Sequence, residues 1–127
     1  MHVTTRTFEE KMPRDPGWSE NCFSYCEFTR IEGEGDHVDS VFQDCRFVEC
    51  DWYWALFNLS VFVGAEFKNC TFRGCSFADC AFVECEFVDC RFTVDNFGRV
   101  CSFEGSRWYA CKQSNTVGIE ASFPNAL

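Results

Sequence analysis

Phenylalanine recurs at every fifth position through the middle of the chain, and a cysteine stands two places before most of these rings. The rings are Phe67, Phe72, Phe77, Phe82, Phe87 and Phe92, and the cysteines are Cys70, Cys75, Cys80, Cys85 and Cys90. A step of five residues advances about 140° around an α-helix, which would scatter the rings over every side. On a flat strand an odd period would send alternate rings to opposite faces. The pattern therefore predicts neither regular element.

A short extended segment followed by a corner in every repeat places all rings on one side. Within each segment Cys and Phe are two apart, so their side chains point the same way. Four such corners close a square coil, and successive coils stack. Rings in equivalent positions of successive coils are then expected to form four ladders, namely Phe42–Phe62–Phe82, Phe47–Phe67–Phe87, Trp52–Phe72–Phe92 and Phe57–Phe77–Phe97.

This tandem C-x-F-x-x pattern resembles the pentapeptide-repeat family, whose unit is a small residue, a polar residue, a central Leu or Phe and two variable positions. The repeat is continuous from Ser40 to Phe97, and further units stand at Asn21–Phe23, Cys26–Phe28, Cys101–Phe103 and Ser106–Trp108. The resemblance implies an all-β fold, a right-handed quadrilateral β-helix. The repeats present correspond to about four to five coils, with non-repeat caps at the open ends.

The repeat pattern also divides the chain into segments. Residues 1–20 show no repeat and are expected to cap the N-terminal end, with Trp18 as an apolar anchor. Residues 21–123 form the solenoid, and residues 31–39 (IEGEGDHVD) are interpreted as an exposed acidic loop inserted in its first coil. Residues 112–127 are expected to form a C-terminal cap or an association surface, through which a homodimer could form.

Composition narrows the class of partner. The chain has 127 residues, which suits one domain, and carries a net charge of −9 with a pI near 4.6. This charge argues against direct binding to nucleic acid or to an anionic membrane, and favours a basic protein partner or simply solubility. The start of the chain has no apolar targeting segment, so we expect a soluble protein of the cytoplasm.

The cysteine spacing favours buried, reduced thiols. Eleven cysteines would suggest a disulfide framework in a small secreted protein. Here neighbours in sequence lie on successive walls of the coil, and those in equivalent positions of successive coils have parallel Cβ vectors that make a disulfide dihedral hard to satisfy. Structural zinc sites use pairs of closer spacing that converge on one ion. We therefore expect neither a disulfide nor a metal, and no cofactor.

No catalytic constellation is apparent in the sequence. The two histidines are His2 and His37, and the chain has no nucleophile elbow, phosphate-binding loop, zinc-protease motif or dinucleotide fingerprint. The repeat cysteines stand among phenylalanines, without a base that could activate a thiolate. We expect a protein that is not an enzyme.

The outward positions of the repeats carry many carboxylates. Counting in coils places Asp44 and Glu84 on one wall and Glu49, Glu66, Glu86 and Asp89 on the next, and the predicted loop adds Glu32, Glu34 and Asp36. Two interpretations are open. An acidic surface can keep a stacking protein soluble and monomeric, or the acidic side can bind a basic partner.

The second outward feature is apolar and lies within residues 51–63. Tyr53, Trp54, Leu56 and Leu59 fall at positions that the pattern turns outward. Exposed clusters of this kind usually mark a contact surface. The alternative, which we favour slightly, is that the N-terminal segment or the 31–39 loop folds over them.

Three functions are compatible with these features, and the first two come from the family resemblance. Some acidic pentapeptide-repeat proteins resemble a DNA duplex and protect DNA gyrase or another topoisomerase, but they tend to be longer rods. The preferred hypothesis is an immunity-type inhibitor that neutralises a basic toxin acting on nucleic acid. The third is a structural or assembly scaffold that docks through its apolar patch and its ends.

Overall fold

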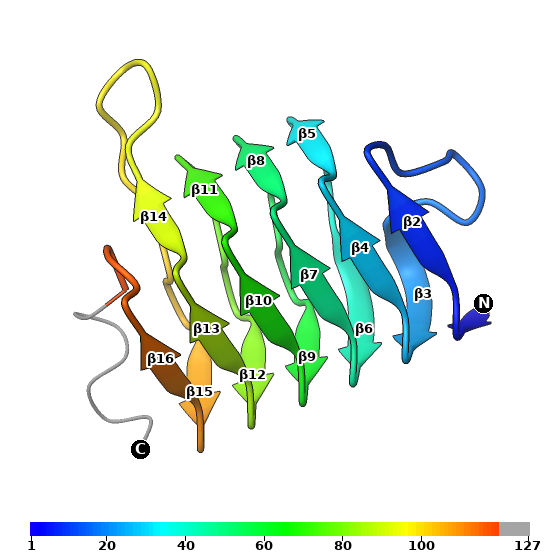
Figure 1. Cartoon of the computed structure of the whole chain (residues 1–127). Coiled ribbons are helices and arrows are strands. Elements are labelled where there is room, and N and C mark those ends of the chain that lie inside the picture. Colours follow the sequence, from blue (N-terminus) through cyan, green and yellow to red (C-terminus); the bar gives the residue numbers. More distant parts are fainter. Residues whose placement is uncertain (120–127) are drawn as a thin grey trace.

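The computed structural model describes residues 1–119 and consists, over this range, of short strands without any helix. The strands wind into a β-solenoid of about five turns (Figure 1). Three parallel sheets form three walls of the coil, and single bridges such as Leu56 to Ser76 and Ser76 to Ser102 form the fourth wall. The cross-section is therefore quadrilateral, as the five-residue period predicts.

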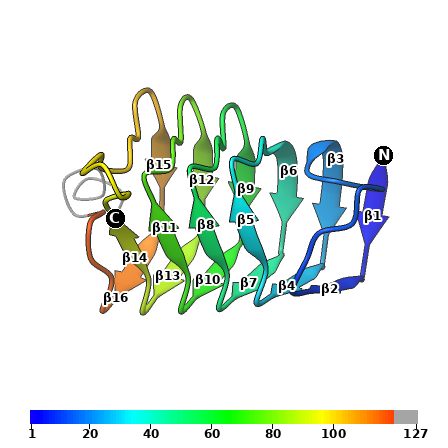
Figure 2. The same cartoon turned by 90° about the horizontal axis from the view of Figure 1, so that it is seen from above.

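Each sheet contains equivalent strands of successive coils (Figure 2). The first sheet contains β1 (His2–Thr4), β3 (Ser19–Ser24), β6 (Asp39–Gln43), β9 (Val61–Val63), β12 (Ala81–Val83) and β15 (Arg107–Tyr109). The second contains β2 (Thr7–Glu9), β4 (Glu27–Thr29), β7 (Arg46–Val48), β10 (Glu66–Lys68), β13 (Glu86–Val88) and β16 (Lys112–Ser114). The third contains β5 (Glu32–Glu34), β8 (Asp51–Tyr53), β11 (Thr71–Arg73) and β14 (Arg91–Thr93).

Most strands are three residues long, and their middle residue points inward. In β10, Phe67 is in register with Phe47 on one side and Phe87 on the other. The chain then turns through a residue in the left-handed region, such as Asp44 with φ of 52°. A non-glycine residue there costs about 1–2 kcal/mol. A hydrogen bond between coils offsets this cost, because the Asp44 N–H donates to the Val63 carbonyl at 2.8 Å.

The core consists of stacked aromatic ladders. Phe47, Phe67 and Phe87 stack at centroid distances of 4.7 and 4.8 Å, with interplanar angles of 6°. The ladder Phe42–Phe62–Phe82 is stacked in the same way. In the ladder Trp52–Phe72–Phe92 the rings are also parallel, with centroids 4.6 Å apart for Phe72–Phe92 and 6.5 Å apart for Trp52–Phe72. The twelve residues predicted for the core are all at most 6% exposed, namely Phe47, Phe67, Phe72, Phe77, Phe82, Phe87, Phe92, Cys70, Cys75, Cys80, Cys85 and Cys90.

The fourth ladder differs from the prediction. Phe77 stacks on Phe57 at 4.7 Å and on Phe103 at 5.0 Å, whereas Phe97 is 74% exposed. The wall that Asp95–Phe97 was expected to build is built by Cys101–Phe103, and residues 94–100 leave the coil as a loop. The reason is the chemistry of Asp95, since a carboxylate in the small-residue position would have been buried among rings without a partner.

The N-terminal segment is partly repeat, contrary to the expectation for residues 1–20. Strands β1 and β2 belong to the solenoid, with Val3 in register with Phe23 and Phe8 in register with Phe28. Only residues 10–18 are irregular. Within this part Trp18 packs on Phe28 and Trp52, both at 5.1 Å, so this segment covers the open end of the ring ladders.

Residues 31–39 form walls of the coil, so the prediction of an exposed acidic loop is wrong. Glu32–Glu34 is strand β5 of the third sheet, and Val38 is buried at the inward position of the fourth wall. The central residues 23, 28, 33 and 38 keep the five-residue step, and the lost residue lies between Val38 and Phe42. The sequence interpretation missed this because Gly33 replaces the central ring.

The cysteines line the interior as small residues. All eleven lie within the described range and are free thiols. The buried ones donate to carbonyl oxygens of the preceding coil, as Cys90 does to Phe67 at 3.3 Å. Burial raises the pKa of Cys45 to about 12 and that of Cys80 to about 11. These thiols therefore stay protonated at neutral pH.

The C-terminal prediction is only partly open to comparison. Residues 112–114 form strand β16 of the second sheet, and Ile119 is buried. Residues 120–127, including the possible unit Ala121–Phe123, lie outside the described residues.

Candidate protein-binding surfaces

The first candidate surface is the second sheet with its two flanking corners. Asp44 and Glu84 project from the corner between the first and second sheets, on either side of Gly64. Glu49 and Asp89 project from the corner between the second and third sheets, on either side of Asn69. In each corner the two carboxylates are two coils apart, about 9.6 Å at the inter-strand spacing. We call this set, together with Glu66 and Glu86 on the strands between, the acidic wall.

Ion pairs reduce the charge of the acidic wall at its centre. Arg46 lies between Glu27 and Glu66 in register and pairs with them at 3.1 and 2.8 Å. Glu86 is in register with Glu66 and Lys112 and forms no ion pair with residues 1–119. Within the same range, Asp44, Glu49, Glu84 and Asp89 are also outside every ion pair, and Asp89 accepts a hydrogen bond from Asn115 at 2.7 Å. The corners therefore retain most of the free negative charge.

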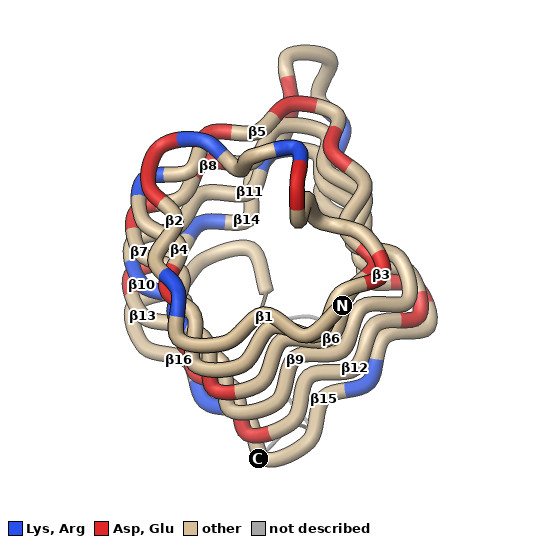
Figure 3. The backbone as a smooth tube through the Cα atoms, turned by 90° about the vertical axis from the view of Figure 1, so that its right-hand side faces the viewer, with Lys and Arg blue, Asp and Glu red and all other residues tan. Residues whose placement is uncertain are grey.

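The acidic field is not confined to one side, as the sequence interpretation supposed. Carboxylates also gather at the corner between the fourth wall and the first sheet, through Glu20, Asp39, Asp79 and Glu104. All four are exposed, and Figure 3 shows acidic segments on more than one side of the coil. The repeat spacing could have predicted this second group. It did not, because the residue missing between Val38 and Phe42 shifts the count for Glu20 and Asp39.

The second candidate surface is the loop of residues 94–100 with the aromatic pair beneath it. Tyr53 and Trp54 are half-buried, and this loop contacts both of them. Of the 31–39 segment, Glu34 lies beside Tyr53 in the next strand of the third sheet. The Trp54 indole N–H donates to Asp95 Oδ2 at 2.7 Å, and the Tyr53 hydroxyl accepts from the Asn96 N–H at 3.0 Å. Phe97 stacks on Trp54 with centroids 6.0 Å apart.

Asp95 holds the loop in shape. Its side chain is fully buried, and Oδ1 accepts the backbone N–H groups of Phe97 and Arg99 at 2.8 and 2.9 Å. Gly74 allows this approach, because a Cβ there would lie 2.9 Å from the Asp95 Cβ. Burial tends to raise the pKa of Asp95, but the hydrogen bonds from Trp54, Arg99 and Phe97 and the charge of Arg99 lower it on balance.

The tip of the loop is apolar and open to solvent. Val94 is 45%, Phe97 74% and Val100 69% exposed. Of the apolar residues predicted from sequence, Leu56 is half-buried on the fourth wall and Leu59 is 70% exposed at the next corner. The apolar surface is thus larger than predicted, and its most exposed part comes from a segment that the repeat count had placed in the core.

The remaining predicted acids lie at the N-terminal end of the coil. Glu32 and Glu34 are exposed on β5, in register with Asp51 and Tyr53 of the third sheet. Asp36 takes the inward, small-residue position of the fourth wall and is only partly exposed. The three residues therefore do not form one exposed acidic loop.

Residues 1–119 contain no group of three His, Cys, Asp or Glu side chains arranged to hold a metal ion. Over the same range no helix is long and apolar enough to cross a membrane.

Comparison with known proteins identifies the repeats of this chain. A profile of pentapeptide repeats matches residues 38–74 and 60–93, with eight copies. A search of curated protein sequences finds no match. Among solved structures, the pentapeptide-repeat protein Rfr23 from the cyanobacterium Cyanothece 51142 aligns with a TM-score of 0.67 and 8% identity, over 91% of this chain and 86% of that one.

QnrB1, a plasmid-mediated fluoroquinolone resistance protein, aligns with a TM-score of 0.38 and 13% identity, over 91% of this chain and 69% of that one. The repeat match and the Rfr23 alignment agree with the coil described above. The chain belongs to the pentapeptide-repeat family.

Proposed function

We propose that this protein is a non-enzymatic inhibitor that binds a basic protein acting on nucleic acid, in the manner of an immunity protein that neutralises a toxin. The observation that carries the proposal is the acidic wall. Five of its carboxylates form no ion pair with residues 1–119, namely Asp44, Glu49, Glu84, Glu86 and Asp89.

The geometry of these carboxylates suits competition with a nucleic acid. A nucleic-acid backbone presents regularly spaced negative charges, and proteins that bind it carry a complementary basic surface. The corner carboxylates are likewise repeated along a fixed axis, because each corner backbone is held in the left-handed region and hydrogen-bonded to the next coil. Such a field accelerates association with a basic partner, and the rate falls as salt rises.

The test is affinity capture of tagged protein from its own organism, with identification of what binds at low and at high salt. A variant with Glu49→Lys, Glu86→Lys and Asp89→Lys reverses three of the six carboxylates of the acidic wall. A matched control with Glu20→Lys, Asp79→Lys and Glu104→Lys makes the same change of net charge at the other acidic corner.

The proposal expects a basic partner that cleaves or modifies nucleic acid, that is lost at high salt, and that binds the control variant but not the acidic-wall variant. Capture of a topoisomerase that shows the same dependence on salt and on the acidic-wall substitutions would instead indicate that the protein protects that enzyme. A partner that resists salt and binds both variants equally would overturn the acidic-wall proposal.

A second candidate function is docking of a scaffold through the 94–100 loop, favoured by the exposure of Phe97 and Val100 on an ordered loop. Replacing both with Ser would then abolish partner binding, while salt would have little effect. If binding survives that double change, the loop is not the docking site.

A further inference from the structure

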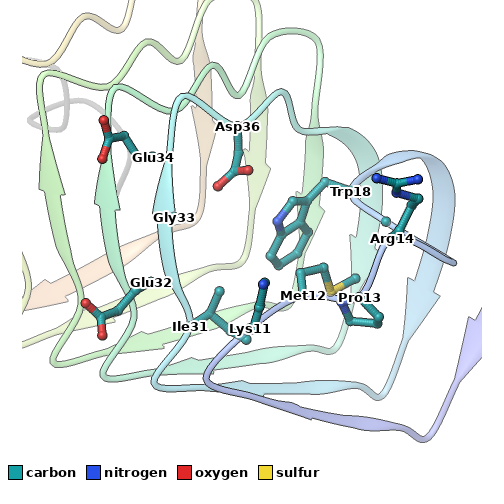
Figure 4. A pocket seen from close by; sticks show the side chains of 11 residues that line it. Lys11, Met12, Pro13, Arg14, Trp18, Ile31, Glu32, Gly33, Glu34 and Asp36 are labelled. Atoms are coloured by element: carbon teal, nitrogen blue, oxygen red, sulfur yellow. The ribbon is translucent and has the colours of Figure 1, made fainter.

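A cavity of about 730 Å³ opens at the N-terminal end of the solenoid, between the irregular residues 10–18 and the third sheet (Figure 4). Its lining includes Lys11, Met12, Trp18, Ile31 and Asp36. The size falls within the range of about 300–1,000 Å³ that is usual for small-molecule sites. The inference below rests on this cavity and does not depend on the proposed function.

The cavity exists because one core ring is missing. Gly33 occupies the central position that Trp52, Phe72 and Phe92 fill in the following coils. The carboxylate of Asp36 turns toward the vacated place, since a Cβ on Gly33 would lie 2.1 Å from Asp36 Oδ2. Residues equivalent to Asp36 in the next coils are Ala55 and Cys75, both buried and uncharged.

The Asp36 carboxylate therefore points inward. It forms no ion pair with residues 1–119, and burial raises its pKa, against a smaller opposing effect of His37. A partly buried carboxylate without an ion-pair partner can be stabilised by a cation that donates hydrogen bonds to it.

Trp18 adds a donor that lacks an acceptor. The residue is 8% exposed, and Figure 4 shows its indole nitrogen on the edge of the ring that faces Gly33 and Asp36. No residue in the range 1–119 accepts a hydrogen bond from this N–H. Among the described residues only Trp52 has a fully buried side-chain N–H without a partner, so the Trp18 N–H reaches the open cavity, where a ligand or water can accept from it.

The other charged residues of the lining are two cations and two acids. Lys11 and Arg14 form no ion pair with residues 1–119. Glu32 and Glu34 also belong to the lining, but both are exposed and Figure 4 shows their carboxylates directed away from Trp18 and Lys11. Figure 4 shows the Lys11 ammonium directed into the space beside Ile31 and below Trp18. A simple anion would be repelled by Asp36, and a simple cation by Lys11 and Arg14. A ligand that carries both charges matches the lining.

We propose that this end cavity binds an α-amino acid zwitterion, either a free amino acid or a dipeptide. Asp36 accepts hydrogen bonds from the ammonium group. Lys11 and the Trp18 indole N–H bind the carboxylate, and Met12 and Ile31 contact an apolar side chain.

The experiment is a titration followed by the indole ¹H–¹⁵N signal of Trp18 in the full chain. The probes are the proteinogenic amino acids and dipeptides of apolar residues, each compared with its N-acetylated and its C-amidated form. The variants are Asp36→Asn and Lys11→Gln, with Glu104→Gln as a control that removes an exposed carboxylate outside the cavity lining.

The expected result is a saturable shift of the Trp18 signal with at least one zwitterion in the millimolar range or below. Each cavity variant should weaken binding at least about tenfold, the loss of one charged hydrogen bond, and Glu104→Gln should leave it unchanged. Preference for dipeptides over free amino acids, or the reverse, identifies the source of the ligand.

Three results would overturn the inference. One is the absence of any saturable shift, and another is equal binding of the end-blocked compounds. The third is a shift that persists in both Asp36→Asn and Lys11→Gln, provided that the remaining amide signals show both variants to be folded.

Discussion

Phe77 and Phe97 occupy the same place in the repeat pattern but opposite environments in the protein. Phe77 is 2% exposed between two stacked rings, and Phe97 is 74% exposed on a loop. The difference follows from the residue two places before each ring. Cys75 takes the inward small-residue position of the coil, whereas the buried Asp95 carboxylate is used by Trp54 and the loop backbone, which donate hydrogen bonds to it.

This pair gives a matched test of core packing. Phe77→Ala should lower the free energy of unfolding by about 3–5 kcal/mol, because the ladder keeps the cavity that the ring leaves. Phe97→Ala should change it by less than about 0.5 kcal/mol, as for an exposed residue. Chemical denaturation of both variants measures the difference, and similar losses in the two would contradict the register described here.

The cysteines give a second test at the residue scale. In the folded protein a thiol-alkylating reagent should modify at most Cys22 and Cys101, because the other nine are buried. For Cys45 and Cys80 protonation adds to the protection, since burial raises their pKa to about 12 and about 11. The pKa of Cys111 is lowered to about 7 by a hydrogen bond from Cys85, so its protection rests on burial alone. Mass spectrometry should count eleven modified thiols after denaturation, and a lower count would reveal disulfides.

At the scale of elements, neighbouring side chains accommodate two departures from the repeat. At Gly33 the missing ring leaves the end cavity, which Trp18 and Asp36 line. At residues 94–100 the additional segment is stabilised by Asp95, which accepts hydrogen bonds from Trp54 and from the loop backbone. Both departures create surface chemistry that the regular repeats lack.

The loop should respond to acid through Asp95. Because the pKa of this carboxyl is lower in the folded protein than its ordinary value of about 3.9, its stabilising effect is complete above that value and is lost as the pH falls through the lowered one. Within that acidic window we expect the indole signal of Trp54 to shift as its hydrogen bond is lost.

Asp95→Asn should shift the same signal already at neutral pH and lower the melting temperature. Its amide group cannot accept from both the Trp54 indole and the backbone N–H groups. Asp79→Asn is the control, since it neutralises an exposed carboxylate at another corner. A Trp54 signal that is unchanged in Asp95→Asn would show that Asp95 does not anchor the loop.

At the scale of the whole molecule, acidic residues cover more than one side, and the middle of the first sheet is free of them. Apart from Asp39 at the start of β6, the outward residues of its central strands are Val41, Gln43, Val61, Val63, Ala81 and Val83. A net charge of −9 on so small a body implies self-repulsion in the folded state. Much of the acidic surface therefore costs stability, which is consistent with a role in recognition.

Salt should accordingly stabilise the protein. Raising ionic strength from about 0.01 to 0.15 M shortens the screening length from about 30 to 8 Å and should raise the melting temperature. The three reversals in the acidic wall each add two positive charges, changing the net charge from −9 to −3, and should reduce this dependence. A melting temperature that falls with salt would mean that ion pairs such as Arg46–Glu66 outweigh the repulsion.

Much of the architecture was predictable from the sequence alone. The five-residue period required a corner in every repeat, since no regular helix or strand can turn all the rings inward, and it therefore determined the walls, the thiols and three of the four ladders. The Cys and Phe residues of the regular repeats lie on the walls that counting in five-residue steps predicts. The acidic positions around the second sheet follow from the same count.

Only the tertiary structure decided the segments that break the period. Gly33 and Asp36 belong to the coil despite their residue types, because the chain on either side keeps its register. Residues 95–97 leave the coil despite fitting the pattern, because burying Asp95 among rings costs more than forming a loop. The cavity, the covered Trp54 and the exposed Phe97 all depend on these contacts between residues distant in sequence, which a local pattern does not encode.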